Sequence, residues 1–572
     1  CSVCKIRGKD QIYCTDHTQW IPRDVEELRK WAGAYKNAQT RAERKEIFET
    51  HGVRWLSFWL LEYWDPTKML VIDAMHCILE GLVHYHCRHV LRLDASASKD
   101  TADDLKVAFE WPWVPYSHEA ALLDASPEAE PRLQEKHISA VHKIQETLCL
   151  SLARKKSLTL DQMWTHLHNQ SKKGALEFDK AQLKFPEGQQ AATSNQLIVI
   201  LLNWRLHQPL SSEAYIIPTG TSNTLAHIQS VIRETLTPSW VNSVPKNFGE
   251  AKAGSLKADE WRTLSTLYLP IALTTLWGDN DGLPPPVDES DAGYLLQALD
   301  RTMALFQATI LACRYTMTNS RAQAYRKYMM TWTQNLRRLF PHVREGIPRP
   351  NVHAAGHIYD FLLLFGPVLS WWCFPFERLI GVLQKINTNN HRGGEMEATM
   401  MKTMARTANL RRWLQRPDCP ESICQLKILF DKAFMPVSEL PNADEVVEMK
   451  GPQRSYIKFN KGRLSPVTTH AGNSNIIYRW SPGEAPVAGQ IQSIQNVHTD
   501  GRNTGVRFYV RSYNQISAVR DPFARYIHFP AKTYSSTLGQ VVDVIELEDI
   551  LAHAARYDYS YGRSVLVNLS RQ

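Results

Sequence analysis

The chain has 572 residues, of which 44% are hydrophobic and 22% are charged. This is the composition of an ordinary globular protein; it excludes a wholly disordered chain, and the length allows several domains. The net charge of +8, from 66 basic and 58 acidic residues, is compatible with a polyanionic partner and equally with a solvated surface of slight basic bias.

The longest apolar stretch, residues 361–376, contains Gly366, Pro367 and Pro375. It is shorter than the roughly 20 apolar residues that a membrane-spanning helix needs, so we expect no membrane partner. The ten cysteines cluster only near Cys1, and no secretory signal pattern is present, so we expect no disulfide framework.

Residues 1–22 form a Cys/His segment with two close pairs of metal-ligand residues. Their spacing is Cys1-x2-Cys4-x9-Cys14-x2-His17. Two such pairs on tight loops can occupy the edges of a tetrahedron, which predicts a structural Zn²⁺ site. The alternative is four unrelated loop residues.

The sequence of residues 23–94 predicts helices together with one short strand. Residues 24–50 have the charge pattern of a helix that ends at Gly52, and a Trp-rich segment follows. The short apolar run Met69–Ile72 suits a buried strand that ends at Asp73, and a helix then continues to about Leu93.

Residues 95–350 predict a helical domain. Apolar residues recur at helical spacing in two places, with polar loops near 94–104 and 278–291. The recurring positions are Trp261, Leu264, Leu267 and Ile271, and then Leu295, Leu299, Thr302, Phe306 and Ile310.

In the C-terminal part of the chain, the spacing of apolar residues changes from helical to alternating. Residues 351–435 are again helical and aromatic-rich, and 436–454 have the composition of a linker. In 455–572, Val506, Phe508 and Val510 alternate with polar residues after the turn signal at 500–501, which predicts a small β-rich module such as a barrel, ending in a short helix near 548–556.

The segment Asp73-Ala-Met-His76 is a candidate catalytic site. A carboxylate at a strand end is a common metal ligand, and His76 and Glu80 can share the face of the following helix. The alternative is an ordinary helix N-cap at Asp73. For the nearby His84, His86, His89 and Cys87, hydrogen-bonded histidines are favoured over a metal site.

Glu377 lies in the segment Phe374-Pro-Phe-Glu-Arg378, where Pro375 suits the first turn of a helix. A carboxylate among aromatic residues requires a cationic partner. Arg378 or a nearby lysine is one such partner, and a divalent metal is the other.

A basic, polar stretch follows. It is suited to contacts with nucleic-acid phosphates, although a solvated helix face explains it almost as well. The predicted contact residues are Arg392, Lys402, Arg406, Arg411 and Arg412. The sequence has no motif for nucleotide phosphates, dinucleotides, serine hydrolysis or zinc proteolysis, so no nucleotide cofactor is expected.

Several blocks together resemble the transposases of CACTA (En/Spm-type) DNA transposons, in particular the diverged transposase-like proteins of mushroom-forming fungi. These blocks are CSVC with CTDH, YWDPTKMLVIDAMHCILEGLVHYHCR at 63–88, PSWVNSVPKNFGEAKAGSLKADEWRTLSTLYLPIALTTLW at 238–277, and FGPVLSWWCFPFERLIGVLQKINTNN at 365–390. The C-terminal module resembles that of the same fungal proteins less specifically.

The resemblance implies a mainly α protein with a partial ribonuclease-H-like α/β core, interrupted by a helical insertion, plus the β-rich module. It implies phosphodiester hydrolysis and strand transfer by two Mg²⁺ ions held by a D-D-E set. Asp73 and His76 match the family's supporting D-x-x-H motif, although a strand-end aspartate taken alone suggests a direct ligand, and Glu377 matches the final catalytic carboxylate.

In the family both leading aspartates precede the Cys/His cluster, with which this sequence begins. We therefore expect that this chain alone does not cut DNA, and that Mg²⁺ matters only in a longer form. The alternative function is a domesticated or decayed DNA- or chromatin-binding, or interaction, protein with a structural zinc and no catalysis. DNA is the expected partner, self-association is left open, and a nuclear location follows from the resemblance alone.

Overall fold

The structure is a computed structural model. It describes residues 1–7, 11–95, 135–150, 152, 158–170, 172–183, 193–208, 219–280, 282–286, 291–334, 336–340, 349–388, 393–434, 453–460, 462–481, 483–499, 502–560 and 562–571. The chain divides into a larger unit, Cys1–Ala95 with Gly220–Asn335 and Pro348–Gln572, and a smaller unit, Ser96–Thr219 with Leu336–Ile347. The protein is mostly helical with a C-terminal β-rich region, as the sequence predicts.

The N-terminal part of the larger unit differs from the prediction in two places. Residues 24–50 form two helices, α1 (Val25–Asn37) and α2 (Arg41–His51), because Thr40 and Glu43 build a capping box that starts the second. Gly52 ends α2 with a φ of 67°, as predicted. The predicted strand at Met69–Ile72 is wrong: α3 (Pro66–Met69), capped by the Asp65 side chain, ends at the first residue of this segment, and residues 70–72 form no strand.

The helix after Asp73 is mostly π-helical, in two stretches named η4 (Met75–Val83) and η5 (His86–Val90). His86 is fully buried in it. Its Nδ1 accepts a hydrogen bond from the Trp332 indole at 3.1 Å, so its Nε2 is the protonated nitrogen and donates to Thr302 Oγ1 at 2.9 Å. Burial lowers the pKa of His86 to about 3, so this residue is a neutral, hydrogen-bonded core histidine, as expected.

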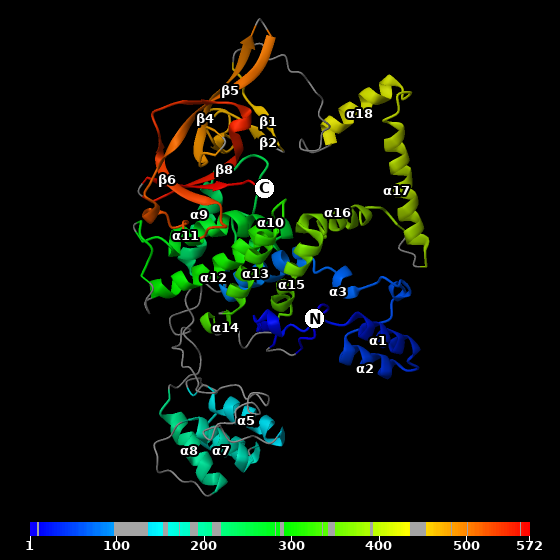
Figure 1. The fold of residues 1–572 in the computed structure, drawn as a ribbon, viewed down its shortest axis with the longest axis vertical. Coiled ribbons are helices and arrows are strands. Elements are labelled where there is room, and N and C mark those ends of the chain that lie inside the picture. Colours follow the sequence, from blue (N-terminus) through cyan, green and yellow to red (C-terminus); the bar gives the residue numbers. More distant parts are fainter. Residues whose placement is uncertain are drawn as a thin grey trace. The chain divides into compact units, whose positions relative to one another are not determined.

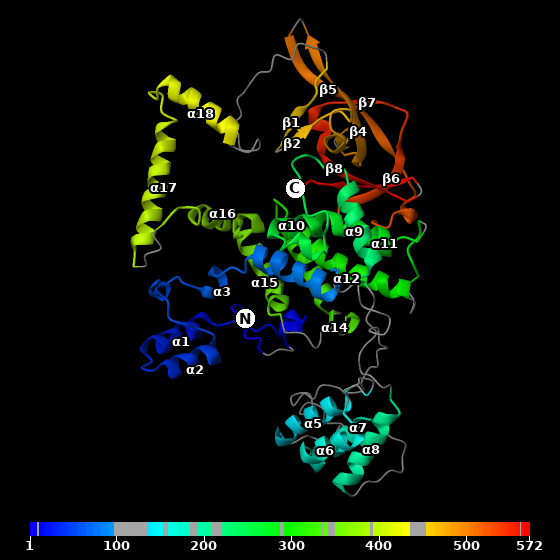
Figure 2. The same ribbon diagram turned by 180° about the vertical axis from the view of Figure 1, so that it is seen from behind.

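Among the remaining helices of the larger unit, α10, α12 and α15 contact η4. Helix α15 contacts both η4 and α13, while α12 contacts α11 and α13, so these helices lie side by side in Figures 1 and 2. Their bounds are α9 (Ser222–Glu234), α10 (Ala258–Thr263), η9 (Leu264–Tyr268), α11 (Leu269–Trp277), α12 (Asp291–Ala312), α13 (Asn319–Gln334), α15 (Asn351–Phe365), α16 (Phe374–Leu383), α17 (Glu395–Trp413) and α18 (Glu421–Phe434).

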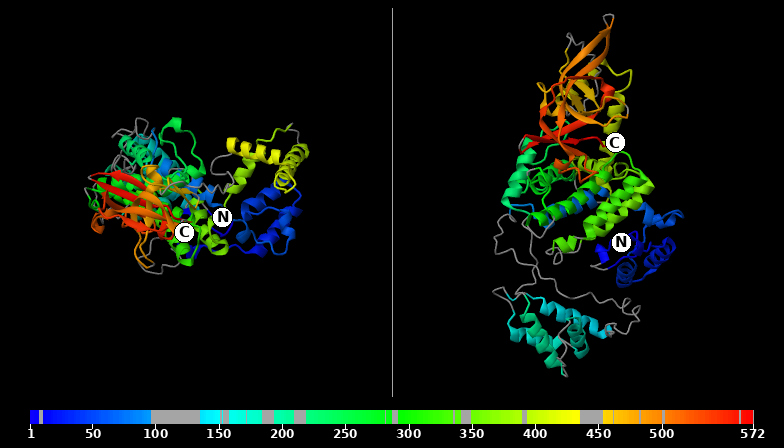
Figure 3. Two further views of the ribbon diagram at one scale, coloured as in Figure 1. Left: turned by 90° about the horizontal axis from the view of Figure 1, so that it is seen from above. Right: turned by 60° about the vertical axis from the view of Figure 1, so that its left-hand side comes forward.

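Six strands among the described residues of 453–571 form a closed barrel, as the alternating pattern suggests. Strands β4, β3, β8, β9, β6 and β5 pair in that order, all antiparallel, and β5 pairs with β4 to close the ring, while β7 also pairs with β5. The long β4–β5 hairpin and the strands around it are visible in Figure 3. The bounds are β1 (Ile457–Phe459), β2 (Gly462–Leu464), β3 (Asn475–Tyr478), β4 (Val487–Thr499), β5 (Arg502–Gln515), β6 (Ala531–Leu538), β7 (Asp543–Ile545), β8 (Ile550–Tyr559) and β9 (Arg563–Asn568), with a short helix α19 (Ala471–Ser474).

Two details of the barrel bear on the prediction. Phe508 and Val510 face the core, as the alternation predicts. The helix predicted near 548–556 is wrong, because β8 occupies most of that segment between its partners β3 and β9. The linker residues 436–452 and the turn at 500–501 lie outside the described residues.

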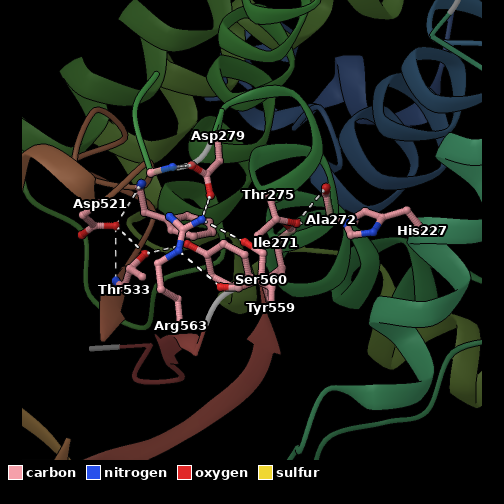
Figure 4. Close-up of polar contacts among 12 residues, drawn as sticks. His227, Ile271, Ala272, Thr275, Asp279, Asp521, Thr533, Tyr559, Ser560 and Arg563 are labelled. Carbon is pink, nitrogen blue, oxygen red and sulfur yellow. Dashed lines mark hydrogen bonds and ion pairs between the residues drawn. The ribbon is translucent and has the colours of Figure 1, made fainter. Parts of the chain in front are cut away.

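The barrel is docked on the helices of the larger unit through buried polar contacts. Leu236, which follows α9, exchanges two backbone hydrogen bonds with Arg556 of β8. At the end of α11, the Asp279 carboxylate forms an ion pair with the Arg563 guanidinium at 2.6 Å, and both side chains are buried (Figure 4). Ser560 also accepts a hydrogen bond from Arg563. The ion pair therefore links the start of β9 directly to the helical core.

The described part of the smaller unit is a helical bundle with its own apolar core. Its helices are α5 (Glu135–Leu148), α6 (Leu160–Gln170), α7 (Lys173–Gln182), α8 (Ser194–Leu206) and α14 (Leu336–Leu339). Asp179 of α7 is fully buried in this core and accepts one hydrogen bond from the Gln145 side chain at 2.9 Å. Burial raises the pKa of Asp179 from 3.8 to about 7.

Asp179 should make the stability of the smaller unit pH-dependent. The folded state favours the protonated carboxyl, so the stability is greatest below pH 3.8 and is lost as the pH rises to about 7. The substitution Asp179→Asn should raise the free energy of unfolding at pH 8 by about 4 kcal/mol and change it little at pH 4. Native-state amide exchange of α7, corrected for the intrinsic rate at each pH, measures this difference. The exposed Asp161→Asn is the matched control, and equal effects of the two substitutions would contradict the account.

No single described helix is both long and apolar enough to cross a bilayer; Asn351–Phe365 and Val368–Leu383 reach that length only together, across a bend of 78°.

Candidate functional site

Asp73 fixes the position of His76 at the start of η4. Asp73 Oδ2 accepts hydrogen bonds from the His76 backbone N–H at 2.8 Å and from His76 Nδ1 at 2.7 Å. Its other oxygen accepts the backbone N–H of Cys373, also at 2.7 Å. Both carboxylate oxygens of Asp73 therefore accept hydrogen bonds from within the protein, as an N-cap side chain does.

Glu377 lies beside His76 although 301 residues separate them. Pro375 is in the first turn of α16, as predicted, and Glu377 follows in the same turn. Glu377 Oε1 is 3.6 Å from His76 Nε2, and both side chains are about half exposed, at 49% each. Because the hydrogen bond of Asp73 orients the His76 ring, the ring presents Nε2 toward the Glu377 carboxylate.

Few candidate metal ligands lie close to His76 among the described residues. Asp73, His76 and Cys373 have ligand atoms within 4.8 Å of one another. The Cys373 thiol is a poor ligand for Mg²⁺, which prefers oxygen, and burial together with the Asp73 charge raises its pKa. Within the described residues of 1–95 there is no strand, so the sheet that would carry further carboxylates in a ribonuclease-H-like core is not seen there.

A second cluster brings Cys1 and Cys4 together with His353 and His357 of α15. All four ligand atoms lie within 4.8 Å of one another. Cys4 Sγ is 3.1 Å from His353 Nε2, which is 3.2 Å from His357 Nε2. Ligand atoms about 3.3–3.8 Å apart are what a tetrahedral zinc ion with its usual bond lengths requires. The cluster could therefore bind a metal.

The surroundings of this cluster fit a metal site. His357 Nδ1 faces the Asp360 carboxylate at 2.9 Å, which leaves the Nε2 lone pair for a metal, and Arg326 pairs with Asp360 at 3.2 Å. The rings of His353 and His357 each pack against Trp20 at 4.8 Å. Burial lowers the pKa of His353 to about 4, so the ring is in the neutral, metal-binding form.

Trp20 also explains the close approach of the Cys/His segment to α15. A Cβ atom at Gly356, between the two histidines, would lie 2.4 Å from the Trp20 ring, so only glycine fits there. The segment is held further by the backbone bridge between Cys4 and Pro22. The contact between the Cys/His segment and α15 therefore depends on the packing of Trp20 as well as on the ligand atoms.

The predicted ligands Cys14 and His17 are not in this group. Cys14 Sγ lies 3.7 Å from the Asp16 carbonyl and from the Gln19 side chain, and His17 is exposed in the short helix η2 (His17–Gln19). His353 and His357 were not predicted from the sequence. Their i, i+4 spacing within a helical segment was the signal that could have found them.

The predicted nucleic-acid contacts lie mainly on α17. Lys402, Arg406, Arg411 and Arg412 are all exposed, and α17 has no buried residue. Arg392 lies outside the described residues. The exposure fits both a phosphate-contacting face and a solvated face.

Comparison of the chain with protein-family models, with curated proteins and with solved structures gives no match.

Proposed function

We propose that the chain is derived from a CACTA-type DNA transposase, binds DNA, and uses Glu377 to hold a divalent cation against the DNA backbone. The observation that carries the proposal is the contact between His76 and Glu377, which joins the two segments that the resemblance assigns to one site. A ribonuclease-H-like origin of residues 23–94 and 351–435 belongs to the same proposal.

The chemistry follows from the arrangement of the side chains. Asp73 holds His76 by a hydrogen bond, and the half-exposed Glu377 carboxylate lies 3.6 Å from His76 Nε2 at the surface. Mg²⁺ keeps several waters and takes one or two carboxylates together with phosphate oxygens, so Glu377 and a DNA phosphate can share one ion. A bound Mg²⁺ would neutralise charge that develops on the phosphate.

The described residues around Glu377 supply too few acidic groups for two metal ions. Two Mg²⁺ ions at close range repel one another and need several anionic ligands between them. We therefore predict that this chain alone does not nick supercoiled DNA in Mg²⁺ or Mn²⁺. Robust nicking that Glu377→Gln abolishes would show that the chain completes the catalytic site by itself.

Metal-dependent DNA binding tests the proposal. Duplex DNA should bind the chain with an affinity that falls steeply as the salt concentration rises. At constant ionic strength Mn²⁺ should tighten binding roughly tenfold, because one shared ion adds on the order of 1.4 kcal/mol. Glu377→Gln should remove this gain, whereas the matched substitution Glu397→Gln in the first turn of α17 should keep it. Absence of duplex binding even at low salt would refute the proposal.

We also propose that the metal at Cys1, Cys4, His353 and His357 is a structural Zn²⁺. Two thiolates and two imidazoles are the soft and borderline ligands that zinc prefers, and four protein ligands leave no open position for catalysis. A structural zinc alone would also suit a non-catalytic interaction protein. The effect of Mn²⁺ on DNA binding distinguishes a transposase-derived protein from an interaction protein. Only the transposase-derived protein is expected to bind DNA more tightly in Mn²⁺.

A further inference from the structure

Three ligand side chains of different chemistry lie together beside Glu377. Asp73, His76 and Cys373 each offer a ligand atom within 4.8 Å of the other two. His76 is in the first turn of η4, and Cys373 immediately precedes α16. A thiol, an imidazole and the Glu377 carboxylate therefore meet at one place, although the two segments are far apart in the sequence.

The hydrogen bonds of Asp73 fix the orientation of the His76 ring. Asp73 accepts the backbone N–H groups of His76 at 2.8 Å and of Cys373 at 2.7 Å, so its carboxylate acts as an acceptor. The 2.7 Å contact between His76 Nδ1 and Asp73 Oδ2 is then a donated N–H. A carboxylate paired in this way with a histidine is the usual support of a metal ligand, because the lone pair of a neutral ring is left on Nε2.

The distance between His76 and Glu377 suits a shared ion better than a direct hydrogen bond. Nε2 and Oε1 are 3.6 Å apart, whereas charge-assisted hydrogen bonds are about 2.7–2.9 Å long. Two ligand atoms of a tetrahedral zinc ion are about 3.3–3.8 Å apart. The lone pair of a neutral His76 faces an anionic oxygen here, so a cation between the two atoms replaces repulsion by attraction. Both side chains are about half exposed, and an ion can therefore reach them from solvent.

The donor atoms select the class of metal. Thiolate and imidazole suit borderline and soft ions, whereas Mg²⁺ takes oxygen ligands. Zn²⁺ binds sulfur, nitrogen and carboxylate oxygen together, and its binding releases the thiol proton to solvent. Such a site binds Zn²⁺ and Co²⁺ more tightly than Mn²⁺. His76, Cys373 and Glu377 supply three ligands, which leaves the fourth position of a tetrahedral ion to water.

We propose that His76 Nε2, Cys373 Sγ and the Glu377 carboxylate form a second zinc site, apart from the structural one, and that zinc bound there withdraws Glu377 from the cation shared with DNA. Zinc at this site therefore inhibits metal-dependent DNA binding. Asp73 is a positioning residue, because it holds the His76 ring and the Cys373 backbone. The inference rests on the proposed function only for the competition with DNA, since zinc binding itself requires no DNA.

Cobalt titration without DNA tests the second site. Three half-exposed ligands bind zinc more weakly than the four of the structural site, so protein with one zinc per molecule should take up one Co²⁺ at the second site. A thiolate-to-cobalt charge-transfer band should then appear in the near ultraviolet. Excess Mg²⁺ should leave this band unchanged, and Zn²⁺ should remove it.

Substitutions assign the band to its ligands. Cys373→Ser should abolish it, whereas Cys424→Ser, at another partly buried free thiol, should keep it. Glu377→Gln and Asp73→Asn should each keep a band but weaken Co²⁺ binding roughly 10- to 100-fold. Thermal unfolding of each variant shows whether the fold is retained. If no band forms in the wild-type chain, or if the band survives Cys373→Ser, the second zinc site is wrong.

Zinc inhibition of DNA binding tests the competition. With duplex DNA and Mn²⁺ present, one equivalent of Zn²⁺ beyond the structural zinc should cancel the gain from Mn²⁺, and Cys373→Ser should require at least about tenfold more zinc. A cobalt band in a chain that binds no DNA would support the zinc site and overturn both the competition and the proposed function. A Mn²⁺ gain that Glu377→Gln removes, without any cobalt band, would support the proposed function and overturn the zinc site.

Discussion

Replacing Cys4 or His357 with alanine is expected to abolish zinc binding. The wild-type chain should contain about one zinc per molecule, because four protein ligands converge on a single point. Either substitution should bring this content near zero and destabilise the contact of residues 1–22 with α15 by on the order of 5 kcal/mol, since structural zinc contributes directly to folding. Elemental analysis of the purified protein measures the metal, and amide exchange at the Cys4–Pro22 bridge measures the contact.

The matched controls for this prediction are Cys14→Ala and His17→Ala. Both residues lie in the same N-terminal segment, yet neither belongs to the converging group. Each variant should keep its zinc and its exchange protection. Loss of zinc from these two variants, with retention in His357→Ala, would show that the four ligands are those of the N-terminal segment alone.

Breaking the ion pair between Asp279 and Arg563 should have the second large effect. Asp279→Ala leaves the Arg563 guanidinium buried without its carboxylate, and removal of one partner of a buried pair typically costs about 3–5 kcal/mol. The loss should appear in the docking of the barrel on the helices, because Asp279 follows α11 and Arg563 starts β9 (Figure 4). Amide exchange of β9, with denaturant unfolding of the whole chain, measures it.

A double-variant cycle separates the energy of the Asp279–Arg563 interaction from the cost of leaving one buried charge without its partner. Asp279→Leu combined with Arg563→Met removes both charges and should destabilise the protein less than either single change, because no buried charge then lacks a partner. The exposed pair Arg416 and Asp418, at 2.8 Å, is the control, and its removal should cost less than about 1 kcal/mol. Additive effects at Asp279 and Arg563 would mean that the two side chains do not interact in solution.

Local signals in the sequence predicted much of the fold. The alternation around Phe508 placed the barrel correctly, Gly52 ended its helix, and Pro375 marked the first turn of α16. The wrong assignments share one cause, which is local propensity overruled by a neighbouring feature. The apolar run at Met69–Ile72 follows an Asp65 cap that starts a helix, and the alanine-rich segment at 548–556 pairs with two strands.

Only half of the candidate metal cluster was predictable from the sequence. Cys1 and Cys4 are neighbours in the sequence, so their spacing suggested a site. The other pair is 349 residues away from Cys4, and the nearer residues Cys14 and His17 offered a competing set with equally good spacing. Trp20 packs against His353 and His357 of α15, and such a long-range contact leaves no periodic pattern in the sequence.

For the Asp73–Glu377 site, in contrast to the metal cluster, the sequence did indicate which distant segments lie together. The motif and the resemblance together predicted that residues far apart in the chain meet, and His76 Nε2 and Glu377 Oε1 lie 3.6 Å apart. The hydrogen bond from the Cys373 backbone N–H to Asp73 joins two segments 300 residues apart, and no local pattern in the sequence indicates it. The π-helical form of η4 was likewise not predicted.

Iron-directed cleavage of the protein backbone tests the central claim most directly. With duplex DNA bound, Fe²⁺ replaces Mg²⁺ as the hard divalent cation, and ascorbate with peroxide then generates radicals that cut the chain near the ion. We expect fragments that end near residues 73–76 and near 373–377 together, competed by excess Mg²⁺ and lost in Glu377→Gln but not in Glu397→Gln. Cuts at only one of the two segments, or a pattern unchanged by Glu377→Gln, would mean that His76 and Glu377 do not share a cation site.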